Sequence, residues 1–130
     1  MTEEAAQSGL SSIGQICINT HDVKKAIEFY RDTLGMKFLF EVPHMAFFDC
    51  GGIRLMLALP DRPEFDHASS IIYFKVQDIQ RAYDDLSSRG VRFESKPSLI
   101  ARLSDHDLWL VDFRDVDNNL LALMSEAPRS

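Results

Sequence analysis

His106 is the residue of this sequence best suited to acid–base chemistry, because Asp105 and Asp107 flank it in the stretch SDHDLW. A carboxylate beside an imidazole stabilises the protonated ring and so raises the basicity of the histidine. Asp112, in the apolar run LWLVDF, is the second candidate for a catalytic role. The alternative is that His106 is a surface or rim histidine that takes no part in chemistry.

Arg54 is the candidate for binding an anion. It follows the glycine pair of CGGIRL, and a two-residue hairpin turn at Gly51 and Gly52 would place Asp49 opposite Arg54 on the same face. A guanidinium at the wall of a pocket suits a carboxylate ligand. The alternative is a structural pair with Asp49 on a wetted sheet surface, which would contribute about 0–1 kcal/mol.

Composition excludes several classes of function. The chain has 130 residues and a formal net charge of −6, and its scattered acidic residues leave no basic stripe for nucleic acid. Neither a membrane span nor a secretory signal is supported, so we expect a cytoplasmic location. The two cysteines, Cys17 and Cys50, are too few for a disulfide framework, and we expect both to be reduced and buried. Motifs for nucleotide binding, hydrolase elbows and zincin metal sites do not occur.

An internal repeat organises the elements that position these residues. The segments that begin at Asp22 and Asp78 match in kind, each with an aspartate at the expected N-cap and apolar residues at helical spacing. Each segment then reaches a glycine, Gly35 or Gly90, suited to the left-handed position after a helix. Two amphipathic helices are therefore predicted.

Short apolar runs bounded by turn residues flank both helices and predict strands. The runs are IGQICIN, KFLFEV, MAFFDC and IRLMLAL in the first half, and SIIYFKV, VRFES, LWLVDF and LLALM in the second. Each half thus reads β-α-β-β-β, which indicates an α+β fold. We expect one domain at 13–124, with module one at about 13–60 and module two at about 70–124, between flexible ends at 1–12 and 125–130.

Two stretches resemble the vicinal oxygen chelate superfamily, which includes glyoxalase I, bleomycin-resistance proteins, fosfomycin-resistance enzymes and extradiol dioxygenases. AIEFYRDTLGMKFLFE is similar to the first helix and next strand of that family, and FRDVDNNLLALMSE to its closing hairpin, F-x-D-P-D-G-N. Val116 and Asn118 replace the usual proline and glycine, but asparagine tolerates positive φ, so the turn should survive. The resemblance covers nearly the whole chain. It implies two tandem βαβββ modules that form a curved mixed sheet around a cavity.

The resemblance also implies a divalent metal, held by one residue from the first and one from the last strand of each module. Those places fall at Gln15, Met56, Ile71 and Ala122. Only Gln15 offers an oxygen, Met56 offers a soft thioether, and the other two have no lone pair. We therefore expect no metal and no cofactor at the usual site.

The period-two alternation of side chains assigns the two faces of each expected strand. One face is aliphatic or aromatic and suits packing under the helices. The other is mixed in polarity and should line the cavity; it carries Gln15, Cys17, Arg54, Met56, Tyr73, Lys75, Ala122 and, across the hairpin, Phe47. The facing of the run at 108–113 stays open, so either Asp112 or Trp109 would join the cavity.

Two classes of function remain open. The first is a metal-free protein of the bleomycin-resistance type that binds a small organic ligand, aromatic or anionic. The second is an isomerase, lyase or dioxygenase-like enzyme, either metal-independent or using displaced ligands such as His44 and His106. The resemblance implies a homodimer. The expected ligand-binding residues are Gln15, Phe47, Arg54, Met56, Tyr73, Trp109 and Ala122, and the catalytic candidates are His106 and Asp112.

Overall fold

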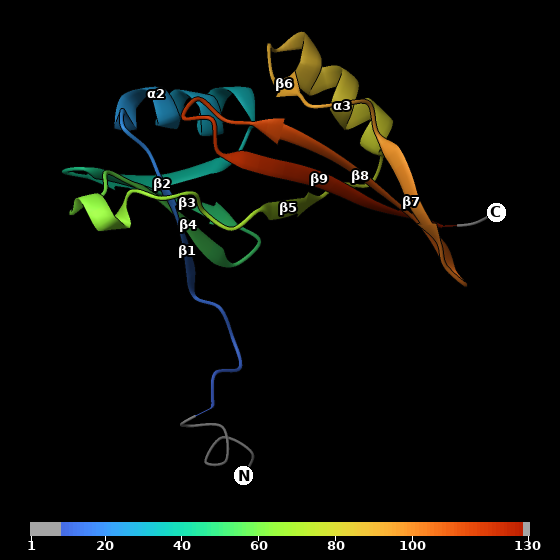
Figure 1. Ribbon diagram of the computed structural model, residues 1–130, viewed down its shortest axis with the longest axis horizontal. Helices are drawn as coiled ribbons and strands as arrows, with labels where there is room; N and C mark the ends of the chain where they lie inside the picture. The colour runs from blue at the N-terminus through green and yellow to red at the C-terminus, as the bar shows by residue number, and fades with distance from the viewer. Residues whose placement is uncertain (1–8, 129–130) are drawn as a thin grey trace.

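The computed structural model describes residues 9–128 and has the expected α+β architecture, with two sheets and a helix over each (Figure 1). Module one contains β1 (Gln15–Asn19), α2 (Val23–Ile27), the π-helix η1 (Glu28–Thr33), β2 (Lys37–Val42), β3 (Met45–Cys50) and β4 (Ile53–Ala58). A linker with the short 3-10 helix η2 (Pro63–Phe65) follows. Module two contains β5 (Ile72–Lys75), α3 (Ile79–Ser88), β6 (Arg92–Phe93), β7 (Ser98–Arg102), β8 (His106–Arg114) and β9 (Leu120–Pro128).

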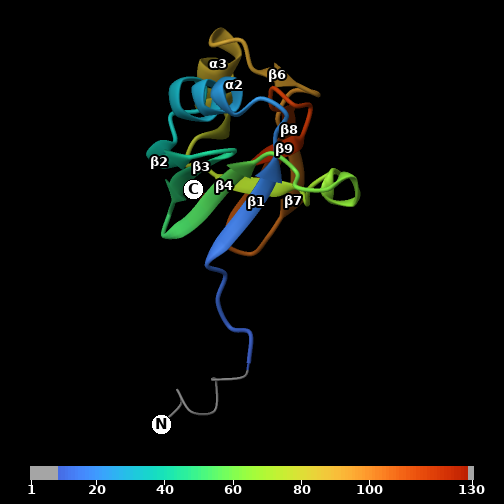
Figure 2. The ribbon, with the colours of Figure 1, turned by 90° about the vertical axis from the view of Figure 1, so that its left-hand side faces the viewer.

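The strands form two mixed sheets, ordered β1-β4-β3-β2 in module one and β5-β9-β8-β6 in module two, with β7 also paired to β8. Both α2 and α3 lie on the same side of the molecule (Figures 1 and 2). We call that side of each sheet the helix side and the other side the open face. No helix in residues 9–128 is long and apolar enough to cross a membrane.

The helix side holds the hydrophobic core, as the alternation predicted. Leu55 and Leu57 of β4 are 2% and 0% exposed, and they belong to one cluster with Ile27 and Tyr30 of the first helical segment. Module two adds further buried residues to this cluster: Ile79, Val91, Val111, Phe113, Leu121 and Leu123. The apolar stripes therefore fix which face of each sheet is left open.

The helix ends of the repeat are confirmed. Asp22 Oδ1 accepts the backbone N–H of Lys25 at 3.1 Å, and Asp78 Oδ1 accepts that of Arg81 at 3.1 Å. Each carboxylate satisfies an N–H that has no partner within the helix. Gly35 and Gly90 have φ values of 75° and 92°, and Asn118 also has a positive φ of 67°.

Three boundaries differ from the sequence prediction. The first helix widens into η1, where the N–H of Leu34 donates to Phe29 O at 2.9 Å across five residues. The strand expected at VRFES is the short β6, and β7, which the sequence analysis did not predict, follows it; both pair with β8, and Pro97, which has no N–H for a sheet, lies between them. Finally, β9 continues to Pro128 alongside β8, beyond the domain end expected at 124.

The turn between β8 and β9 joins the two modules. Buried Asp115 accepts a hydrogen bond from the Tyr30 hydroxyl at 2.7 Å, and the Thr20 hydroxyl donates to Asp117 Oδ2 at 2.6 Å. The Asn119 amide donates to the Asn19 carbonyl at 3.0 Å. Side chains far apart in sequence thus hold module two against the start of α2.

Candidate functional site

The turn between β3 and β4 positions Arg54 as expected. Gly51 and Gly52 have φ values of 64° and 90°, the left-handed conformation that a tight two-residue hairpin requires. In the resulting register Asp49 lies opposite Arg54, and Phe47 lies opposite Met56. Arg54 therefore projects from the open face of module one.

Arg54, Gln15 and Met56 form one contact cluster on that face. Arg54 Nε donates to Gln15 Oε1 at 3.1 Å, and Gln15 Nε2 donates to Met56 Sδ at 3.6 Å. The Asp49 carboxylate instead accepts the N–H of Gly52 at 3.3 Å. The amide of Gln15 thus orients the guanidinium from the neighbouring strand β1.

Two aromatic rings complete the cluster. The Arg54 guanidinium carbon lies 5.5 Å from the centre of the Phe47 ring, and Phe47 stacks on Phe40 of β2 at 4.5 Å. Phe47 is 9% exposed, whereas Phe40 is 43% exposed. An oriented cation beside an aromatic surface can bind a planar anion by charge and by stacking. We call these five residues the arginine cluster.

Tyr73 and Ala122 lie on the open face of module two, where they are cross-strand partners on β5 and β9. Ala122 is fully buried beneath its neighbours, and Tyr73 is 46% exposed. Tyr73 and Lys75 also line a cavity of about 460 Å³ between the edges of the two sheets, opposite Ile16 and Ile53 of module one.

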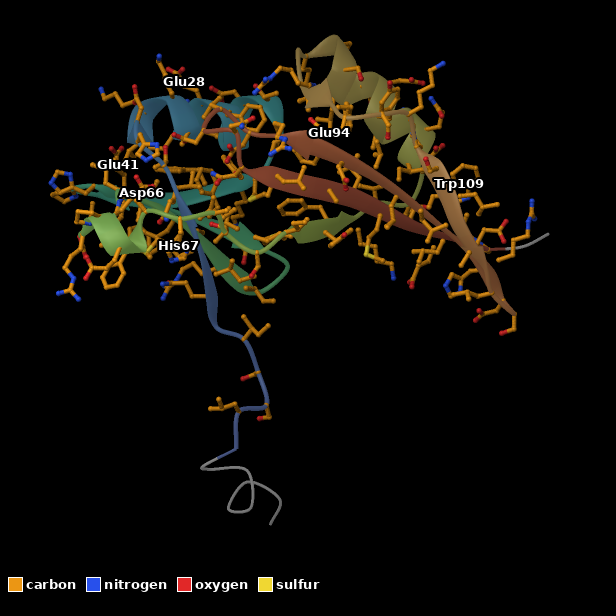
Figure 3. The ribbon with its side chains drawn as sticks, in the orientation of Figure 1. Glu28, Glu41, Asp66, His67, Glu94 and Trp109 are labelled. Atoms are coloured by element: carbon orange, nitrogen blue, oxygen red, sulfur yellow. The ribbon has the colours of Figure 1, made fainter. Side chains whose placement is uncertain are left out.

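The pairing of β8 with β9 determines which of its residues face the cavity side. Asp112 lies opposite Ala122, so Asp112 shares the open face. Trp109 lies opposite buried Ser125, on the helix side near the start of α3 (Figure 3). Trp109 is therefore not on the face that carries the other six expected ligand residues.

His106 lies at the start of β8 among charged groups. Its Nδ1 is 2.7 Å from Asp105 Oδ1, and its Nε2 is 3.5 Å from Glu126 Oε2. Lys75 Nζ lies 2.8 Å from the other Glu126 oxygen, and this hydrogen bond lowers the pKa of Glu126. His106 Nε2 is buried, and within residues 9–128 no hydrogen-bond partner satisfies it.

The two catalytic candidates do not converge. His106 and Asp112 share the open face but stand six residues apart on β8, a separation of about 20 Å along a strand. His44 lies in the turn between β2 and β3 of module one, with a φ of 69°. The structure brings neither Asp112 nor His44 to the His106 side chain.

The residues at the expected metal positions do not fit a metal ion. Gln15 uses its amide on Arg54 and Met56, while Ile71 and Ala122 carry hydrocarbon side chains. Across residues 9–128 no group of three or more His, Cys, Asp or Glu side chains could hold a metal. The donor chemistry of the four expected positions therefore does not fit a divalent metal ion.

Sequence reasoning missed some residues of these surfaces. Phe40 follows a bulge in the pairing of β2 with β3. The bulge shifts the register, so that Phe40 lies beside Phe47 on the open face. Glu126 lies beyond the predicted end of the domain. The expected burial of the free thiol of Cys17 is wrong, because Cys17 is exposed on the open face next to Met56.

One family model matches most of the chain. The model of the Glyoxalase/Bleomycin resistance protein/Dioxygenase superfamily matches residues 12–123. The uncharacterized protein YraH of Bacillus subtilis is 31% identical over 126 residues, covering 84% of this chain and 94% of YraH. The metallothiol transferase FosB of Staphylococcus haemolyticus is 36% identical over 73 residues, covering 53% of this chain and 52% of FosB.

A solved structure extends the agreement to the fold. A superfamily member from Sphaerobacter thermophilus superposes with a TM-score of 0.74 at 25% identity, covering 90% of this chain and 98% of that one.

Proposed function

Because the chain belongs to the Glyoxalase/Bleomycin resistance protein/Dioxygenase superfamily, we propose that its open faces form a binding site for a small aromatic anion. The arginine cluster is the observation that carries this proposal. Arg54 is held by Gln15 and lies over Phe47, so its charge is presented beside a ring rather than used up in an ion pair with Asp49. Tyr73, the exposed residue of the Tyr73–Ala122 pair, would supply the module-two side of the site.

The expected binding mode follows from the chemistry of these groups. A ligand carboxylate would accept hydrogen bonds from the guanidinium donors that Gln15 leaves unused. The aromatic body of the ligand would pack on Phe40, the exposed member of the stacked pair. Met56 adds a polarizable apolar contact on the same face.

Calorimetric titration with benzoate, and with benzyl alcohol as its neutral counterpart, tests the proposal. We expect benzoate to bind more tightly, and Arg54→Met to weaken benzoate about tenfold or more, since hydrogen bonds to charged groups are strong. Arg62→Met is the matched control, because Arg62 also lies over a ring, Phe65, at 4.9 Å, but in the linker. Equal affinity of benzoate for the wild type and Arg54→Met would overturn the assignment.

The second candidate function is catalysis at the open face of module two. The observation that favours it is His106, which lies between Asp105 and Glu126 with Nε2 buried and unsatisfied within the described part of the chain. A histidine between two carboxylates can take up and release a proton in acid–base chemistry. Once a turnover is found, its retention in His106→Ala would remove this candidate.

Elemental analysis of protein purified without chelators tests the metal-free part of the proposal. We expect less than stoichiometric divalent metal, because the usual positions lack hard donors. A stoichiometric ion would require displaced ligands, and loss of that ion in His106→Ala or His44→Ala would identify them.

A further inference from the structure

A second apolar pocket lies on the other side of the molecule, between the helices. Its volume is about 280 Å³, and its walls come from both modules: Leu34 and Met36 follow η1, while Phe74, Leu86 and Leu123 belong to module two. Leu123 is 3% exposed, so the floor reaches the core. This pocket is separate from the arginine cluster, which lies on the open face.

Two charged side chains, Asp85 of α3 and Arg89 at the C-cap of that helix, stand at this pocket. They are one helical turn apart, a spacing that favours an ion pair. Arg89 instead donates from Nη1 to the carbonyl of Thr33, in η1, at 2.9 Å. Within residues 9–128 the Asp85 carboxylate has neither a hydrogen bond nor an ion pair.

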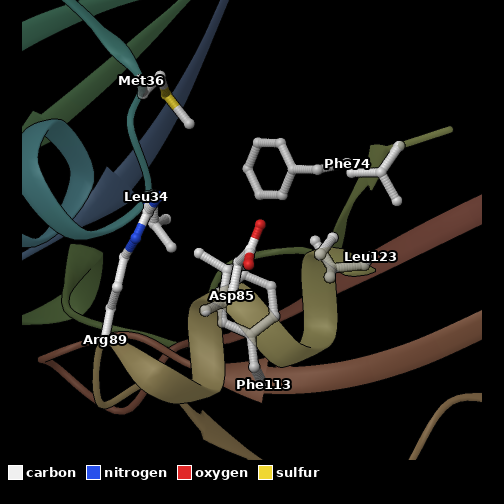
Figure 4. Close-up of a pocket in the computed structure, with 10 residues that line it drawn as sticks. Leu34, Met36, Phe74, Asp85, Arg89, Phe113 and Leu123 are labelled. Atoms are coloured by element: carbon white, nitrogen blue, oxygen red, sulfur yellow. The ribbon is translucent and has the colours of Figure 1, made fainter. Parts of the chain in front are cut away.

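The direction of the Asp85 side chain makes this carboxylate part of the pocket. Figure 4 shows it lying toward the ring of Phe74, whereas Arg89 extends along another wall toward Leu34. A carboxylate beside an aromatic face attracts an organic cation, by charge and through the electron-rich face of the ring. The net charge of −6 also favours a positively charged ligand.

We propose that this pocket binds a small organic ammonium ion, with its apolar body between the modules and its ammonium group between Asp85 and Phe74. Apart from Asp85 and from Arg89, whose guanidinium is held at the Thr33 carbonyl, the pocket lining is apolar, which favours an aryl or alkyl amine over a strongly hydrated metal ion. Because Leu34 and Met36 belong to the other module, the occupant bridges the junction of the two modules.

Nuclear magnetic resonance titration with 2-phenylethylammonium tests the proposal, with 2-phenylethanol and 3-phenylpropionate as neutral and anionic counterparts. We expect the methyl resonances of Leu34, Met36 and Leu86 to shift, and the ammonium compound to bind about fivefold to tenfold more tightly than the alcohol. Asp85→Asn should remove that preference. Asp84→Asn is the matched control, because Asp84 accepts from Gln80 on the same helix and does not line the pocket.

Three results would overturn the assignment. The first is tighter binding of the anionic compound, and the second is an equal loss in Asp84→Asn and Asp85→Asn, which would indicate only the general field of an acidic protein. The third is a set of shifts confined to the open face. Ala82→Leu, which fills the pocket, should abolish all binding there, and its circular dichroism reports whether the fold is kept.

Discussion

The side chain of His21 links three segments of the chain. Its Nε2 lies 3.0 Å from Asp66 in the linker, and its Nδ1 lies 3.3 Å from Asp117 in the turn between β8 and β9. The hydrogen bond and charge of Asp66, followed by the smaller effect of Asp117, raise the pKa of His21. The protonated imidazole therefore joins the linker and module two to the start of α2.

This raised pKa gives stability a defined pH dependence. Folding favours the protonated ring, so the contribution is fully present below the unfolded pKa of about 6.5 and disappears as pH rises through the higher folded pKa. We expect His21→Gln to lower the Tm more at about pH 5.5 than at about pH 8.5. Thermal denaturation across this range measures the difference. His67→Gln, which changes the histidine next to Asp66 in the linker, is the control, and a pH-independent loss in His21→Gln would contradict the linkage.

The buried pair of Tyr30 and Asp115 predicts a second single-residue effect. Tyr30 is fully buried, and Tyr30→Phe removes its 2.7 Å hydrogen bond from a carboxylate that water cannot reach. We expect the free energy of unfolding to fall by about 1–3 kcal/mol, as measured in urea. Tyr73→Phe, at an exposed tyrosine, should change it little, and equal effects of the two substitutions would count against the pair.

At the scale of elements, the β3–β4 hairpin depends on its glycine turn. Gly52 has a φ of 90°, so a side chain there is strained even though a Cβ would meet no atom within 4 Å. We expect Gly52→Ala to destabilise the protein by about 1 kcal/mol in urea unfolding, because left-handed conformations are costly for other residues. Gly14→Ala, where a Cβ also meets nothing within 4 Å, is the control. A neutral Gly52→Ala would mean that the turn adjusts freely.

The elements predictable from sequence were those with local signals. The aspartate caps, the glycines after the helices and the turn of the β3–β4 hairpin act within a few residues, and each was confirmed. The strand β7 and the π-helix η1 were not predicted, because they depend on pairing with β8 and on packing between modules. The facing of Trp109 depends on the register of β8 with β9, which the strand pattern alone left open.

The candidate site was predictable to a similar extent. Alternation placed Arg54, Gln15 and Met56 on one face, and the structure shows these side chains in mutual contact. The bulge that brings Phe40 beside Phe47 and the continuation of β9 to Glu126 required the tertiary pairing of strands. What the open faces bind stays a prediction.

At the scale of the whole molecule, the open faces leave apolar side chains exposed. Phe40, Val42 and Tyr73 are 43%, 40% and 46% exposed, and β1 and β5 are edge strands of their sheets. Exposed apolar groups beside strand edges favour association. We propose that a second copy packs against these faces and encloses the proposed ligand site between the two copies.

Sedimentation velocity at tens of micromolar tests this association. We expect a dimer, and Phe40→Ser should shift the distribution toward monomer because it removes apolar area from the contact. Phe65→Ser, which changes a phenylalanine of the linker that is 46% exposed, is the control. A monomer throughout this concentration range would remove the dimer proposal while leaving the benzoate titration to decide the binding site.

The turn that carries Asp115 and Asn119 also bears on how the protein is made. Tyr30 finds its buried partner 85 positions later, and the carbonyl of Asn19 finds its partner 100 positions later. Contacts of such long range form slowly and only after the intervening chain is available. During synthesis Tyr30 therefore stays without this partner until the turn after β8 has left the ribosome.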